Sequence, residues 1–219
     1  DTRDPEPAPS RGIWAEVIAY GAPDMFERQG NEYLKISAQF RQYITFAPTR
    51  LVAAYRLAYQ GILAGPAPFY IQQNISTLYL RQIASEGLGG KNTVRGILMN
   101  RMVGDGYFWA NAEFRLRLFD FRFLKQDWYL ALNPFFDAGM VVQSYRLGQM
   151  ETRQGELTDA DPVDAGLLYS GNGEKMHFSA GAGIKAVMNR NFIVSLEWGK
   201  PFDKRDGTSG MNIELNYIF

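Results

Sequence analysis

Three charged residues, Arg95, Glu113 and Asp137, have the spacing that suggests the clearest chemistry in this chain. A guanidinium can bind a carboxylate through two parallel hydrogen bonds in a fixed fork. Glu113 and Asp137 lie on the polar faces of two alternating segments, 108–118 and 129–142, joined by a short connection. The carboxylates then become neighbours, and Arg95 can latch its own segment to them. The competing interpretation is a solvated loop arginine and two unrelated carboxylates.

Two other groups of residues are candidates for catalysis or metal binding. His177 is the only histidine, and Ser179 follows it on the same face, as a hydrolase would require. However, no Gly-x-Ser-x-Gly elbow and no third partner accompany them. The acidic segment 151–164 lacks the Asp-x-Asp-x-Asp-Gly spacing of a calcium loop, which favours a solvated loop. We therefore expect no enzymatic activity, no cofactor and no bound metal.

The elements that must position these residues are eight segments in which apolar and polar residues alternate with period two. They run over about 13–19, 34–41, 51–59, 108–118, 129–142, 178–188, 192–199 and 211–219. None of their apolar faces carries a charge, although 21% of the residues are charged. Lys or Arg facing mid-membrane lipid costs roughly 2–4 kcal/mol, so a lipid-facing surface would be emptied of charge. The pattern predicts an all-β fold, an antiparallel transmembrane β-barrel of eight strands.

The last segment ends the chain on an aromatic residue. Leu215, Tyr217 and Phe219 share its apolar face, whereas Asn212 and Glu214 lie on the other. An apolar strand that closes on Phe is typical of outer-membrane barrels. The ending resembles the signal that barrel-assembly machinery reads, which would make this chain a client of that machinery.

Composition sets the remaining limits. The 219 residues predict a single domain, 1–219, and no apolar run approaches the roughly 18 residues of a membrane helix. Mean hydropathy is −0.24, as expected if every second strand residue faces a lumen. Net charge is zero, which gives no indication of nucleic-acid binding, and the absence of cysteine excludes disulfides. No signal peptide begins the chain, so an exported form would be mature or trimmed.

The connections between the segments alternate in length. Short ones are predicted at 47–50, 120–127 and 189–191, and long ones at about 20–32, 60–106, 143–176 and 200–210. Short periplasmic turns and long extracellular loops are typical of bacterial outer-membrane barrels. We therefore expect the outer face of the barrel to contact the lipid of that membrane. A soluble eight-stranded barrel of the lipocalin type would instead point its apolar face inward, without this bias in loop length.

The long loop 60–106 contains a glycine-rich motif around Arg95. Its residues are Gly89, Gly90, Thr93, Val94 and Gly96. This stretch resembles the Val-Arg-Gly loop of the BamA/TamA superfamily, which includes outer-membrane assembly factors, bacterial surface antigens and two-partner secretion transporters. The resemblance implies that the loop folds back into the barrel and that Arg95 latches it to Glu113 and Asp137.

Further matches follow in the family's order along the whole chain. They are the Arg-Asp…Pro-x-x-Gly strand start within 1–12, the Phe-x-Asp-x-Gly-x-Val pattern at 135–141, and Lys200-Pro201-Phe202. Two features depart from the family. Ile97 stands where the family usually has Phe or Tyr, and the chain matches only the C-terminal half of the family barrel, without periplasmic transport-associated domains.

Half a barrel has two strand edges that must be paired. Unpaired backbone groups facing lipid cost several kcal/mol each, so an open sheet is not viable there. The barrel closes on itself, or two copies join as a homodimer through segments 13–19 and 211–219, or the chain is a fragment. A self-closed eight-stranded barrel has an interior just wide enough for side chains. The sequence leaves these alternatives open.

The resemblance implies a non-enzymatic protein that helps to insert or move protein or lipid at the bacterial outer membrane. A periplasmic partner would fit this role. The alternative is a structural or scaffolding barrel that has no transport activity and that could form a dimer. Nucleic acid is not expected as a partner of either.

Overall fold

The structure is a computed structural model that describes residues 1–4, 7–23, 32–48, 50–65, 67–68, 71, 74–76, 83–144, 175–217 and 219. Eight antiparallel strands form one sheet, which confirms the predicted fold class. In sheet order they are β1 (Gly12–Ala22), β2 (Tyr33–Ala47), β3 (Leu51–Ala64), β6 (Gly106–Phe123), β7 (Gln126–Gln143), β8 (His177–Met188), β9 (Phe192–Pro201) and β10 (Gly210–Leu215).

Two small elements lie in the connections. β4 (Ile75–Ser76) and β5 (Ile83–Ser85) pair with each other between β3 and β6, and the 3₁₀ turn η2 (Lys204–Asp206) lies between β9 and β10. Within the described residues, no helix has the length and apolar character needed to cross a bilayer.

The sheet buries its polar face and exposes its apolar face. Val17, Leu57 and Ile213 are 70%, 43% and 71% exposed, whereas Lys35 and Lys185 are fully buried. Strand alternation explains the division, because neighbouring residues point to opposite faces. A sheet in water would hide its apolar face instead. The exposed face is therefore suited to lipid, as the sequence predicted.

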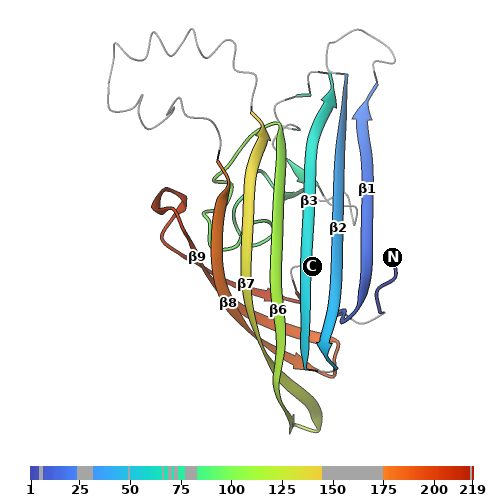
Figure 1. Ribbon diagram of the computed structural model, residues 1–219, viewed down its shortest axis with the longest axis vertical. Coiled ribbons are helices and arrows are strands. Elements are labelled where there is room, and N and C mark those ends of the chain that lie inside the picture. The colour runs from blue at the N-terminus through green and yellow to red at the C-terminus, as the bar shows by residue number, and fades with distance from the viewer. Residues whose placement is uncertain are drawn as a thin grey trace.

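The sheet is twisted and curled but remains open (Figure 1). Among the described residues, no pairing joins β1 to β10, which are the two ends of the sheet order. The self-closed barrel considered from the sequence is therefore not what this chain forms. The reason is steric, because the segment 86–102 lies against the buried face and eight strands cannot close around both it and their own side chains.

The connection between β6 and β7 is shorter than the sequence indicated. Segment 120–127 was expected to be a polar link, but the strands continue to Phe123 and resume at Gln126. Leu124 and Lys125 alone form the turn, with φ of 51° and 61°. Two successive positive φ values are typical of a type I′ hairpin, whose twist matches that of the strands.

The last strand also differs from the prediction of 211–219. β10 ends at Leu215 because β9 offers only one further backbone partner, the carbonyl of Ile193, which accepts from Asn216 N–H at 3.0 Å. Asn216 then takes φ 75°, and the chain turns toward the inner face. Tyr217 and Phe219 consequently do not share the exposed face of Leu215, contrary to the sequence prediction.

Candidate functional site

The Arg95 side chain lies fully buried against the inner face of the sheet. Its Nε and Nη2 atoms donate to Oδ2 and Oδ1 of Asp137 on β7 at 2.8 and 2.9 Å, and its backbone N–H donates to Oδ2 at 2.9 Å. The guanidinium also stacks on Phe135, with Cζ 3.7 Å from the ring centroid. The geometry is the two-pronged pairing that only arginine among the cationic side chains can make.

The third nitrogen of the guanidinium reaches two more strands. Nη1 lies 3.0 Å from Glu113 Oε2 on β6 and 3.3 Å from Glu197 Oε2 on β9. Arg115 Nε donates to the other oxygen of Glu113 at 2.8 Å, and Lys185 Nζ donates to Glu197 Oε1 at 2.7 Å.

These six residues form what we call the Arg95 network. Its members are Arg95, Arg115, Lys185, Glu113, Asp137 and Glu197. Three cations face three carboxylates, so the network has no net charge when all six are ionised. Buried charges are tolerated only when they are paired and hydrogen-bonded, and this arrangement meets that condition.

The residues on either side of Arg95 fit the inner face closely. Val94 is fully buried and fills the space that a side chain on Gly139 would need, since a Cβ there would lie 2.8 Å from Val94 Cγ2. Gly96 has φ 84° and lies against Gly199 of β9, where a Cβ on Gly96 would meet the Gly199 carbonyl carbon at 2.6 Å. In the Val-Arg-Gly motif, the valine therefore fills the space beside Gly139, the arginine supplies the buried charge, and the glycine allows the loop backbone to approach β9 closely.

The other predicted motif residues hold the loop in shape. Thr93 Oγ1 accepts from Gly89 N–H at 2.9 Å and lies 3.1 Å from the Gly89 carbonyl oxygen. Gly90 N–H donates to the Ile97 carbonyl at 3.0 Å, which closes the loop around Arg95. Ile97 itself is buried with Val94 and Leu88, so the aliphatic residue is accommodated where the family usually has an aromatic one.

Side chains from β3 and β6 bind the loop backbone as well. Arg56 Nη2 donates to the Asn92 carbonyl at 2.9 Å, and Asn111 Nδ2 donates to the Thr93 carbonyl at 2.7 Å. Arg56 Nε also donates to Asn111 Oδ1 at 2.8 Å. The loop is thus attached to β3, β6, β7 and β9 within a few residues of Arg95.

The comparison with protein families covers all of these elements. The model described as the Omp85 superfamily domain matches residues 1–219. The chain belongs to the Omp85 superfamily. This is the BamA/TamA superfamily to which the sequence motifs pointed, and its proteins are assembly and translocation factors of the bacterial outer membrane. No curated protein matches the chain significantly.

In this Omp85 chain, the sole histidine lies at the rim rather than in a catalytic arrangement. His177 Nδ1 lies 2.7 Å from Asp206 Oδ2 of η2, and the Asp206 carbonyl accepts from Leu98 N–H at 2.9 Å. The Ser179 hydroxyl donates to the Arg95 carbonyl at 2.5 Å. His177 and Ser179 therefore serve different contacts, and both contacts hold the loop.

Neighbouring charged residues stabilise η2, the turn that binds the loop through the Asp206 carbonyl. Asp203 caps η2, and hydrogen bonds from the Arg205 side chain and backbone hold the pKa of Asp203 below its usual range. The Arg205 carbonyl accepts from Arg101 Nε at 2.9 Å. Among the described residues, no cluster of three or more acidic or histidine side chains could hold a metal ion. The acidic segment 151–164 lies outside the described residues.

The C-terminal tail reaches the same network from the other side. The centroid of the Tyr217 ring lies 3.9 Å from Arg115 Cζ, and the main-chain oxygen of Phe219 accepts from Arg115 Nη2 at 2.6 Å. The Phe219 side chain packs with Tyr43 on β2 and Ala54 on β3. Of the three residues expected to form an assembly signal, only Leu215 remains on the exposed face.

Lys185, Glu197 and Arg115 were not among the residues predicted for the latch. Their period-two position was the available signal. It could not show which of many inward charges would meet, because that depends on the pairing register between strands. Ser179 and Asn111 gave no signal that would have linked them to the loop.

Loss of the guanidinium should release the loop. We expect Arg95→Ala to lower the free energy of unfolding by about 3–5 kcal/mol, because Asp137 would remain buried with an uncompensated charge. Proteolysis between about residues 86 and 105 should accelerate accordingly. Arg95→Lys should fall between wild type and Arg95→Ala, since an ammonium cannot make the two-pronged bond. Unchanged proteolysis of Arg95→Ala would show that the network does not hold the loop.

Shortening the last side chain should destabilise the isolated protein, independently of any cellular signal. We expect Phe219→Ala to cost about 3 kcal/mol, near the lower end of the range for a buried Phe, through loss of its packing with Tyr43 and Ala54. Denaturant unfolding in synthetic vesicles measures this, with Leu215→Ala on the exposed face as the comparison. Equal stability of the two variants would contradict the inward position of Phe219.

Proposed function

We propose that this chain is a non-enzymatic β-barrel protein of the bacterial outer membrane that helps to insert or move protein or lipid. The supporting observation is the Arg95 network, which fixes a long loop on the polar face of a sheet whose other face is exposed and apolar. Membership of the Omp85 superfamily supports the same class of function.

The arrangement separates two environments across one sheet. Lipid would contact the outer face, while the inner face carries the Arg95 network, in which three cations are paired with three carboxylates. Beyond Ile13, whose backbone groups bond with Thr2, the edge of β1 offers backbone groups to which an extended polypeptide segment can add as a strand, and the outer edge of β10 does the same.

A scaffolding barrel without transport activity is the second candidate, and its support is the strength of the internal attachment of the loop. The two candidate functions can be distinguished in cells that require the protein. If the loop serves assembly, cells carrying Arg95→Lys should contain less of other outer-membrane barrel proteins, at unchanged levels of the variant itself. Quantitative proteomics of the outer membrane measures both quantities.

The matched control is Arg11→Lys, at an exposed arginine outside the Arg95 network. It should leave the barrel content at the wild-type level. A normal content of other barrels in Arg95→Lys cells, or after complete depletion of the protein, would contradict an assembly function and favour the scaffold.

We also propose a second copy of the chain as the partner of the open edges. β1 and β10 run antiparallel, so β10 of one copy can pair with β1 of another in a ring of two. Both edge strands carry apolar residues on the exposed face, Val17 on β1 and Ile213 on β10, which would continue one lipid-facing surface across each seam.

Cysteine cross-linking tests this pairing without a background reaction from native thiols, because the chain contains no cysteine. A mixture of Val17→Cys and Ile213→Cys chains, treated with a short bismaleimide in membranes, should give a covalent dimer. Either variant alone should give no covalent dimer, because the two identical positions lie on opposite sides of the ring and are too far apart for the reagent. A mixture that stays monomeric would contradict the second copy and leave the edges to strands from another polypeptide.

A further inference from the structure

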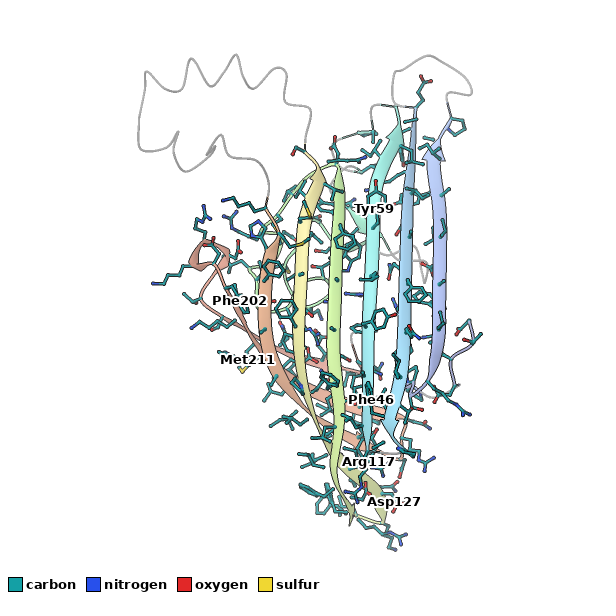
Figure 2. All side chains as sticks on the ribbon, in the orientation of Figure 1. Phe46, Tyr59, Arg117, Asp127, Phe202 and Met211 are labelled. Atoms are coloured by element: carbon teal, nitrogen blue, oxygen red, sulfur yellow. The ribbon has the colours of Figure 1, made fainter. Side chains whose placement is uncertain are left out.

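The hairpin formed by β6 and β7 continues past the strand on its β3 side. β3 pairs with β6 only as far as Leu51 opposite Leu116, whereas β7 pairs with β6 to the end, at Gln126 opposite Phe123. The additional six or seven residues correspond to roughly 20 Å of strand. Figure 1 shows this hairpin as the lowest part of the molecule, and Figure 2 places Asp127 on it well below Phe46 of β2.

A β-bulge determines which side chains the extension exposes. The register between β6 and β7 shifts between Arg117 and Phe119, which leaves Leu118 as an additional residue in β6. Without this shift, Phe119 and every second residue after it would lie on the inner face, as Arg115 does. With it, Phe119 lies opposite Leu130 and therefore joins the apolar outer face.

Four aromatic residues on that face form what we call the hairpin ridge. They are Phe119, Phe121, Phe123 and Trp128. The three phenylalanines are 55%, 40% and 56% exposed, and Phe121 stacks on Trp128 with ring centroids 6.3 Å apart. A contiguous aromatic surface of this kind marks a site of interaction with another apolar partner.

The opposite face of the extension is charged. Arg117 pairs with Asp120 at 2.5 Å, and Arg122 lies 3.8 Å from Asp127. The free edge of β6 thus carries charges as well as a bulge, and both features discourage the addition of a further strand. A peptide partner is therefore disfavoured at the edge, which leaves the ridge itself as the surface to be covered.

Continuity of the ridge with the apolar face above it identifies its occupant as lipid. The outer face of β6 is apolar from Phe108 to Phe123, whereas that of β3 is apolar only from Leu51 to Leu63. At the hairpin end, the apolar band consequently reaches further on β6 and β7 than on β3. Aromatic side chains at the end of such a band suit the layer between acyl chains and water.

We propose that the hairpin ridge inserts into the periplasmic leaflet of the outer membrane and anchors this side of the barrel at greater depth than the β1–β3 side. The proposal rests on the membrane location put forward above. Tilt of the barrel or local thickening of the bilayer accommodates the difference in the level at which the apolar band ends. The charged face of the hairpin then remains in water, and the anchor lies away from the open edges of β1 and β10.

Spin labels on single cysteines test the proposal in vesicles of phosphatidylethanolamine and phosphatidylglycerol. The sites are Phe121→Cys on the ridge, Arg122→Cys on the opposite face of the same strand, and Leu57→Cys on the outer face of β3. Power saturation compares collision with oxygen, which concentrates in lipid, and with a water-soluble nickel chelate. Phe121 should resemble Leu57, with an oxygen-to-nickel ratio several-fold higher than that at Arg122.

Every other outcome contradicts one specific claim. If Leu57 favours oxygen while Phe121 favours nickel, the ridge lies in water and only the anchor is wrong. If both favour nickel, the outer face does not contact lipid, and the proposed membrane function fails with it. If Phe121 is protected from both reagents while Leu57 favours oxygen, protein covers the ridge, and the lipid anchor is replaced by a protein-docking surface.

Discussion

The pairing of one buried guanidinium governs the arrangement around it. Arg95 has no access to water, so its charge requires carboxylates within hydrogen-bonding distance, and Asp137, Glu113 and Glu197 supply them from three different strands. Those strands must therefore keep one register relative to one another. The loop must also approach their backbone closely, which the contact between Gly96 and Gly199 permits.

A sheet that buries charge and exposes apolar side chains needs two compensations. On the inner face, the three cations and three carboxylates of the Arg95 network neutralise one another, and side chains such as Arg56 and Asn111 bind the loop carbonyls. On the outer face, lipid would supply the compensation, because an apolar surface is stable in it. At the outer edges of β1 and β10, no further strand pairs among the described residues, although Thr2 N–H donates to the Ile13 carbonyl at 2.8 Å and so covers the start of the β1 edge.

The loop is held at several points along its length, and this distribution bears on its function. Lys35 Nζ donates to the carbonyls of Ile71 and Asn74 at 2.7 Å each, near the beginning of the segment between β3 and β6. The Arg95 network fixes the middle, and the Asp206 carbonyl binds Leu98 beyond it. A segment fastened in this way acts as part of the wall. Changes at any one attachment should therefore affect loop order before they affect the strands.

The sequence by itself determined the features that depend on local periodicity. Alternation with period two gave the eight strands, their lipid-facing and inward faces, and the inward positions of Glu113 and Asp137, because each residue's face follows from its neighbours along the chain. The Val-Arg-Gly motif indicated that Arg95 would approach them. Only the tertiary structure decided what depends on distant partners. The bulge at Leu118 turned three phenylalanines outward, the short reach of β9 turned Tyr217 and Phe219 inward, and the register between β8 and β9 brought Lys185 to Glu197. Register and strand length are set by pairing between segments far apart in the chain, which alternation within one segment does not encode.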